Sequence, residues 1–153
     1  TAPADEPARE LPQQISKETT MSATLALTAQ DQLTVRTAAY GAVSLLAAGS
    51  SKPHKAATAG STALLSATGT VGHVLAAKSK DVKLAGKSVA ELADQVLPSL
   101  TAAVAVLGQS DPAEADNFRT TVQVAIEAAT ADVRPGPVTT EMIRKITTAM
   151  HTA

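Results

Sequence analysis

Apolar residues recur every three or four positions over most of the chain, the spacing that places side chains on one face of an α-helix. Weaker stripes of this kind occupy residues 28–48, 112–131 and 139–151, and the clearest one spans residues 89–107. Its apolar positions are Val89, Leu92, Val96, Leu100, Ala103, Val104 and Leu107. The sequence shows no alternating runs or hairpin dipeptides that would predict strands. The pattern therefore predicts an all-α fold.

Capping residues mark where three of these helices begin. Thr28 and Asp31 have the spacing of a capping box, and Ser88 and Glu91 have it again. Pro112 stands where a helix tolerates proline best, at its first position, with an acid in the same turn. These signals predict helix starts next to each of the capping residues.

Residues 56–77 contain no Lys, Arg, Asp or Glu and are rich in Ala, Gly, Ser and Thr. We expect one helix from Pro53 to the end of this stretch, at the centre of a bundle, because small side chains let neighbouring backbones come close. Gly69 and Gly72 inside it should each cost about 1 kcal/mol relative to alanine. Close approach of another helix, with Gly41 as the candidate contact, would explain why they are tolerated.

An uncharged stretch of this length also raises the possibility of a transmembrane helix. Roughly half of its residues are Gly, Ser, Thr or His, and it contains no Ile or Phe. Such a segment is close to neutral for membrane insertion. We therefore expect no transmembrane helix here, and packing between helices in water instead.

Pro98 interrupts the most regular stripe. A proline inside a helix removes one hydrogen bond and clashes with the carbonyl one turn earlier, at Asp94. We expect a kink at this point, or a break into two short helices. The complete prediction is an antiparallel bundle of four long helices, with a short C-terminal helix at residues 139–151 closing an end or a groove.

The chain has 153 residues, which predicts a single domain. Residues 1–20 contain three prolines, several charges and almost no large apolar side chain, so we interpret them as a flexible arm. An arm that lies across a neighbouring subunit is the alternative. Residues 21–153 then form the bundle.

Composition narrows the possible functions. With one Phe, one Tyr and no Trp, the core must consist of Leu, Val, Ile and Ala, which bury little area per residue. The formal net charge of -1 lacks the positive excess of nucleic-acid-binding domains, so we expect no nucleic-acid partner. The absence of cysteine excludes disulfides, thiolate metal sites and a cysteine nucleophile.

The N-terminal region is acidic where a secretory signal would be basic and then apolar. We therefore expect a cytoplasmic protein, although a secreted protein that has lost its leader would look the same. The one basic run lies at residues 78–87. We interpret it as a solvated loop, and contact with an anionic partner is the alternative. Its lysines are Lys78, Lys80, Lys83 and Lys87, opposed by Asp81 alone.

Few side chains suggest chemistry. His54, His73 and His151 are far apart in sequence, whereas a metal site needs three or four converging ligands, so we predict no metal. His73 is the most notable because its helix is otherwise uncharged. A histidine at the edge of the core is the favoured interpretation, and a ligand contact is the alternative. Tyr40, the only tyrosine, should be half-buried with its hydroxyl in water.

Phosphate-loop and Glu-x-x-His motifs are also absent from the sequence. With no catalytic arrangement in view and smooth alanine-rich helix faces, we expect a non-enzymatic bundle. It would bind a protein partner or its own copies and need no cofactor. The alternative is a small-molecule or ion site near His73, Tyr40 and the proline at position 98. An enzyme or a membrane-surface protein of a type that these residues do not reveal is a third hypothesis.

Overall fold

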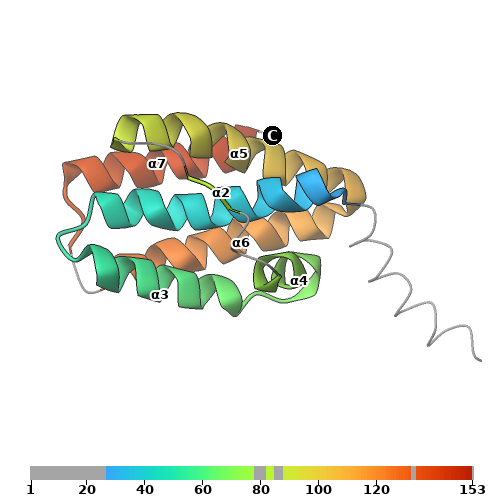
Figure 1. Cartoon of the computed structure of the whole chain (residues 1–153), viewed down its shortest axis with the longest axis horizontal. Coiled ribbons are helices and arrows are strands. Elements are labelled where there is room, and N and C mark those ends of the chain that lie inside the picture. The colour runs from blue at the N-terminus through green and yellow to red at the C-terminus, as the bar shows by residue number, and fades with distance from the viewer. Residues whose placement is uncertain (1–26, 78–81, 85–87, 132–133, 153) are drawn as a thin grey trace, which may run out of the picture.

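The computed structural model describes residues 27–77, 82–84, 88–131 and 134–152, and most of these residues lie in helices (Figure 1). Within them there is no strand, so the all-α prediction is confirmed. The predicted arm at residues 1–20 and most of the lysine run lie outside the described residues. The helices are α2 (Ala29–Ala48), α3 (Pro53–Leu65), α4 (Gly69–Ala76), α5 (Val89–Ser110), α6 (Pro112–Ala129) and α7 (Pro137–Thr152).

Four long helices form the frame of the molecule. α2 packs on α3 and α5, and α6 packs on the same two helices, with neighbours in this ring antiparallel (Figure 1). α4 lies at one end of the frame against α2, α3 and α6, whereas α7 packs mainly on α5. The predicted antiparallel bundle is therefore present. The short helix is the internal α4, and α7 is longer than expected.

α2 is the central helix, contrary to the prediction for residues 56–77. It contacts all five of the other described helices, as α6 also does, and its contact with α5 is the most extensive between any two helices. Arg36, Gly41 and eight apolar residues of α2 are buried, whereas α3 buries only Ala56, Gly60 and Leu64. The predicted capping box at its start is confirmed, because Thr28 Oγ1 accepts a hydrogen bond from the Asp31 amide at 3.0 Å. From this position α2 supports the C-terminal end of α4, as described below.

The single helix predicted over the central stretch is wrong. α3 ends at Leu65 and α4 begins at Gly69. Gly69 has φ +69°, in the left-handed region that favours glycine. A Cβ at Gly72 would lie 2.2 Å from the carbonyl oxygen of Ala67, so the turn closes too tightly for any side chain there. Both glycines therefore permit the turn between α3 and α4.

Glycines do allow helices to approach α2 closely, but the contacting pairs differ from the expected contact of Gly69 or Gly72 with Gly41. A Cβ at Gly60 of α3 would lie 2.8 Å from a methyl carbon of Val43 on α2. A Cβ at Gly41 of α2 would lie 2.5 Å from a methyl carbon of Val96, which belongs to α5. The two glycines thus bring α2 close to two different neighbours.

α5 continues through Pro98 as one helix, so the alternative of a break is wrong. The proline lies on the exposed side of α5, away from its buried stripe. By length and composition α5 is also the one described helix that could cross a membrane. In the structure its apolar stripe, including Leu100 and Leu107 at 0% exposure, packs inside the bundle.

Candidate functional site

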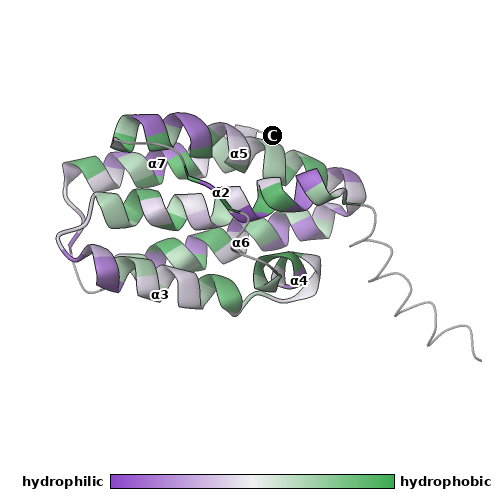
Figure 2. Ribbon diagram, viewed as in Figure 1, coloured by the Kyte–Doolittle hydropathy of each residue, from purple (hydrophilic) through white to green (hydrophobic). Residues whose placement is uncertain are grey.

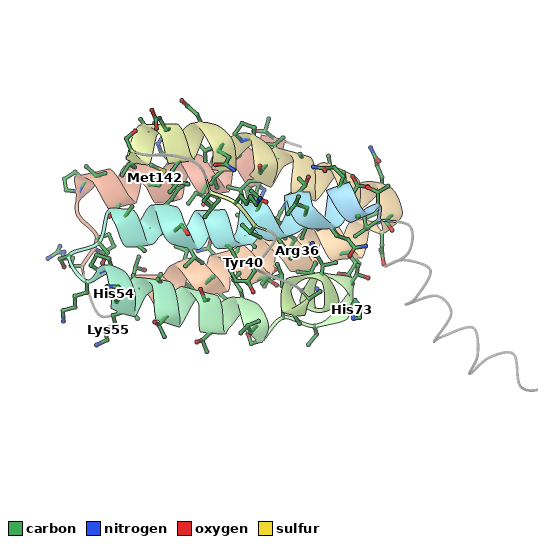
Figure 3. The ribbon with its side chains drawn as sticks, in the orientation of Figure 1. Arg36, Tyr40, His54, Lys55, His73 and Met142 are labelled. Atoms are coloured by element: carbon green, nitrogen blue, oxygen red, sulfur yellow. The ribbon has the colours of Figure 1, made fainter. Side chains whose placement is uncertain are left out.

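The two predicted site residues, Tyr40 and His73, do not converge. The Tyr40 side chain does reach α4, the helix that carries His73. Tyr40 of α2 is half-buried, as expected, and its hydroxyl donates a hydrogen bond to the Leu75 carbonyl of α4 at 3.0 Å. The hydroxyl was expected to face water. His73 is exposed on α4 and lies at the outer edge of the molecule, so its placement at the core edge is wrong (Figure 3). Pro98 is exposed on α5.

A second side chain of α2 supports the same end of α4. Arg36 precedes Tyr40 by one helical turn, so both side chains leave the same face of α2. Arg36 is only 5% exposed, and its Nη1 donates to the Val74 carbonyl at 3.5 Å. The last carbonyls of a helix have no partners within the helix, and the negative end of its dipole favours a cation. Arg36 and Tyr40 together supply hydrogen-bond donors to the carbonyls at the C-terminal end of α4.

The environment keeps the Tyr40 hydroxyl protonated. Burial raises the pKa of Tyr40 above its ordinary value of 10.0, while the positive charge of Arg36 acts in the opposite direction. Desolvation is the larger effect because the ring lies against the core. The hydroxyl therefore remains a hydrogen-bond donor to Leu75 well into the alkaline range.

The other end of α4 is held by α6. Thr68, which precedes α4, makes no side-chain cap. Glu114 takes this role: its Oε2 accepts a hydrogen bond from the Val71 amide at 3.1 Å. Asn117 donates to the Thr68 carbonyl at 2.8 Å and to the Glu114 carboxylate at 3.3 Å. A carboxylate is the group that the positive end of a helix dipole favours.

Gly69 makes this contact possible. A Cβ at this position would lie 2.6 Å from Oε1 of Glu114, and the backbone is already in a conformation that side chains avoid. Any larger residue at position 69 would push the carboxylate away from the start of α4. Gly69, which separates α3 from α4, thus also leaves room for the Glu114 carboxylate that caps α4.

We call Arg36, Tyr40, Glu114 and Asn117 the α4 clamp. An isolated helix of eight residues is unstable in water, so α4 depends on its contacts with the frame. Both polar ends of the clamp bind backbone groups, and Val71, Val74 and Leu75 fill the space between them at 0–1% exposure. This geometry positions a helix. The charged groups that it uses are engaged with that helix.

Sequence reasoning missed the clamp. Tyr40 was singled out, but no pattern in the sequence marked Arg36 for burial, and Glu114 was visible only as the acid in the turn that follows Pro112. The helix start predicted at Pro112 is confirmed, and Asp111, which precedes the proline, caps α6 by accepting a hydrogen bond from the Ala113 amide at 3.0 Å. No local sequence signal marked the clamp, because each of its side chains binds a backbone group 35 or more residues away.

The same scheme recurs at the last turn of α7. Thr101 of α5 donates to the Ala149 carbonyl at 2.8 Å, and Nε of Arg119 on α6 donates to the Met150 carbonyl at 3.1 Å. Arg119 also pairs with Asp116 at 2.6 Å. Side chains of the frame thus bind the C-terminal carbonyls of both additional helices, α4 and α7.

Several hollows lie elsewhere on the described surface. One, of about 260 Å³, lies between the end of α2 and the start of α7, beside Gly49 and Thr139. Another, of about 290 Å³, lies between α2 and α5 beside Leu33 and Gln95. A third, of about 370 Å³, lies between α6 and the end of α7 beside Val124 and His151. Neither Tyr40 nor His73 lines them. Among the described residues, no group of three His, Asp or Glu side chains is placed to bind a metal ion.

No protein-family model, curated protein or solved structure matches the chain.

Proposed function

We propose that the protein is a non-enzymatic helical bundle that associates with another protein chain or with its own copies through the outer face of α3. The observation that carries this proposal is Leu65, which is 59% exposed at the end of an uncharged helix face. We also propose a cytoplasmic location and no nucleic-acid partner, and the formal net charge of -1 supports the second of these.

The α3 face consists of the outward positions Thr58, Thr62 and Leu65. Their spacing of four and three residues places them on one side of the helix, and all three are exposed. Figure 2 shows α3 as hydrophilic in its first turn and paler or hydrophobic beyond it. His54 and Lys55 belong to that first turn (Figure 3). A surface without charges costs less to remove from water than a charged one.

The small side chains of this face also suit contact with another helix. Threonine and serine let two helix backbones come close. Ser66, next to the exposed leucine, donates its hydroxyl to the Ala63 carbonyl at 2.6 Å, so this hydroxyl already has a partner for its proton. The hydroxyls of Thr58 and Thr62 would have to find hydrogen-bond partners across the interface when the α3 face is buried. Leu65 would supply most of the apolar area.

A small-molecule or ion site near Tyr40 and His73 is the alternative. The hydroxyl of Tyr40 and Nη1 of Arg36 already donate to carbonyls of α4, so a ligand there would have to replace those hydrogen bonds. The exposed α3 face needs no such rearrangement. We therefore favour association.

The test compares two lysine substitutions on different faces by sedimentation velocity over a range of concentrations, with pull-downs from a lysate of the source cells. Leu65→Lys should abolish self-association or partner retention. Val124→Lys is the matched control, because Val124 is 43% exposed on α6, and it should leave both unchanged. A strict monomer that retains no partner, or equal effects of the two substitutions, would contradict the proposal.

A further inference from the structure

We propose that the hollow between the ends of α2 and α6 and the start of α7 binds a compact organic anion, a carboxylate or a phosphate ester with a short apolar body. The hollow has a volume of about 260 Å³. We call it the α2–α7 hollow, and its lining includes Leu46, Gly49, Ser50, Ala129, Arg134 and Thr139. No residue of the α3 face lines it, and the proposal does not depend on that face.

The α2–α7 hollow has an apolar floor and a polar rim. Leu46 and Ala129 line it although they are only 1% and 7% exposed, so they lie at its bottom. Ser51 and Arg134 line it and are exposed, so they lie at its mouth. A mostly apolar concavity with a few polar groups is typical of sites for small molecules. This arrangement suits a ligand with an apolar body and one charged end.

Arg134 is the side chain that selects an anion. Three of the four described arginines bind groups of the protein itself. Arg36 and Arg119 donate to helix carbonyls, and Arg144 pairs with Glu141. Arg134 makes no hydrogen bond or ion pair with another described residue. A guanidinium matches the paired oxygens of a carboxylate or a phosphate better than any other side chain does.

Neighbouring charges favour an anion at the same place. A smaller hollow shares Ser50 and Ala129 with the α2–α7 hollow and is lined by Lys52 and Lys55. Figure 3 shows Lys55 at this end of the molecule, where α2 turns into α3. Among the described residues that line the two hollows there is no Asp or Glu. The local potential is therefore positive and raises the concentration of anions at the mouth.

One hydroxyl in the hollow can add a hydrogen bond to such a ligand. The Thr139 hydroxyl already donates to the Gly49 carbonyl at 3.1 Å. Oγ of Ser50 instead accepts a hydrogen bond from the Lys52 amide at 3.0 Å, which leaves its own proton to be donated to a ligand. The hollow thus combines a guanidinium, a hydroxyl donor and an apolar floor.

Titration of the full chain with small probes, followed by heteronuclear NMR of the backbone amides, tests the site. The probes are benzoate and phenyl phosphate, which carry a carboxylate or a phosphate on a small ring. At least one of these anions should cause saturable shifts at Gly49, Ser50 and Gly136. Benzamide, the neutral counterpart of benzoate, should bind about tenfold more weakly than that anion, because it lacks the charge. The anion that binds more tightly identifies the charged group of the ligand.

Substitutions then test the role of Arg134. Arg134→Gln should weaken binding of the anion about tenfold, and Arg134→Lys should restore part of the loss. Lys145→Gln is the matched control, because Lys145 is an exposed cation of α7 outside the hollow, and it should leave binding unchanged.

Three results would overturn the proposal. They are a lack of saturable shifts with both anions, equally tight binding of benzamide, and a loss in Arg134→Gln no larger than that in Lys145→Gln. The comparison of probes uses the wild-type chain alone, so it decides even if a variant fails to fold.

Discussion

α4 and α7 both pack against the frame of α2, α3, α5 and α6, but their sequences require different kinds of contact. α4 has eight residues and no charge, and it is bound at both ends by charged side chains of the frame. α7 has sixteen residues, and a ridge of methionine and isoleucine seats it in a groove. Thr101 and Arg119 bind the carbonyls of its last turn.

The difference follows from length. Half of the backbone polar groups of a very short helix lack partners within the helix, so capping from outside decides whether α4 forms. A helix of four turns satisfies most of its own backbone groups, and burial of its apolar side chains then dominates. We therefore expect α4 to depend on Glu114 and Arg36, and α7 to depend on Ile146.

The largest effect is expected where α7 packs on the frame. Ile146→Ala should lower the free energy of unfolding by about 3 kcal/mol, because the side chain is 0% exposed and its removal leaves a cavity. Val138→Ala on the same helix is the control: Val138 is 64% exposed, and the change should stay within about 0.5 kcal/mol. Urea denaturation measures both. Equal losses would mean that the ridge does not seat α7.

The next effect concerns the start of α4. Glu114→Ala should cost about 2 kcal/mol in urea denaturation, because the Val71 amide loses a charged acceptor where water has limited access. Glu127→Ala removes an exposed carboxylate from the same helix and should have little effect. If the two substitutions destabilise the protein equally, Glu114 does not act through α4.

A smaller effect is expected at the other end of the clamp. Tyr40→Phe keeps the ring and removes the hydrogen bond to Leu75, which should cost about 1 kcal/mol. Thermal unfolding monitored by circular dichroism would measure it. An unchanged midpoint would show that the hydroxyl adds nothing to the seat of α4.

The smallest effect is expected in the pH dependence of the free energy of unfolding, to which Tyr40 contributes. The folded chain raises the pKa of Tyr40 above 10.0, so its stabilising contribution is complete below about pH 10 and is lost as the pH rises through the raised value. Tyr40→Phe should remove this alkaline loss. The chain has one tyrosine and no tryptophan, so ultraviolet absorbance follows this titration alone. The midpoint should fall when urea unfolds the protein, and an equal midpoint in both states would contradict the assignment.

The frame could be predicted from the sequence because its signals are local. Thr28, Ser88 and Asp111 each accept a hydrogen bond from an amide two or three residues later, within the span that a sequence pattern covers. The buried stripe of α5 likewise follows from residue spacing alone. These elements form where the sequence indicates because their causes lie within a few residues.

α4 could not be predicted because its causes are distant. The Val71 amide is bound by Glu114, which is 43 residues away, and the Leu75 carbonyl is bound by Tyr40, which is 35 residues away. Gly69 and Gly72 were visible in the sequence, but they fit a continuous helix with close neighbours as well as a turn. Only the arrangement of the frame decides between the two.

Hydrogen exchange of the α4 and α7 backbone amides tests the comparison most directly, measured residue by residue in the wild-type chain, Glu114→Ala and Ile146→Ala. Glu114→Ala should speed exchange in α4 and leave α7 protected. Ile146→Ala should speed exchange in α7 and leave the local opening of α4 unchanged. If either substitution speeds exchange equally in both helices, the two are not seated independently, and the proposed division between end contacts and buried contacts is wrong.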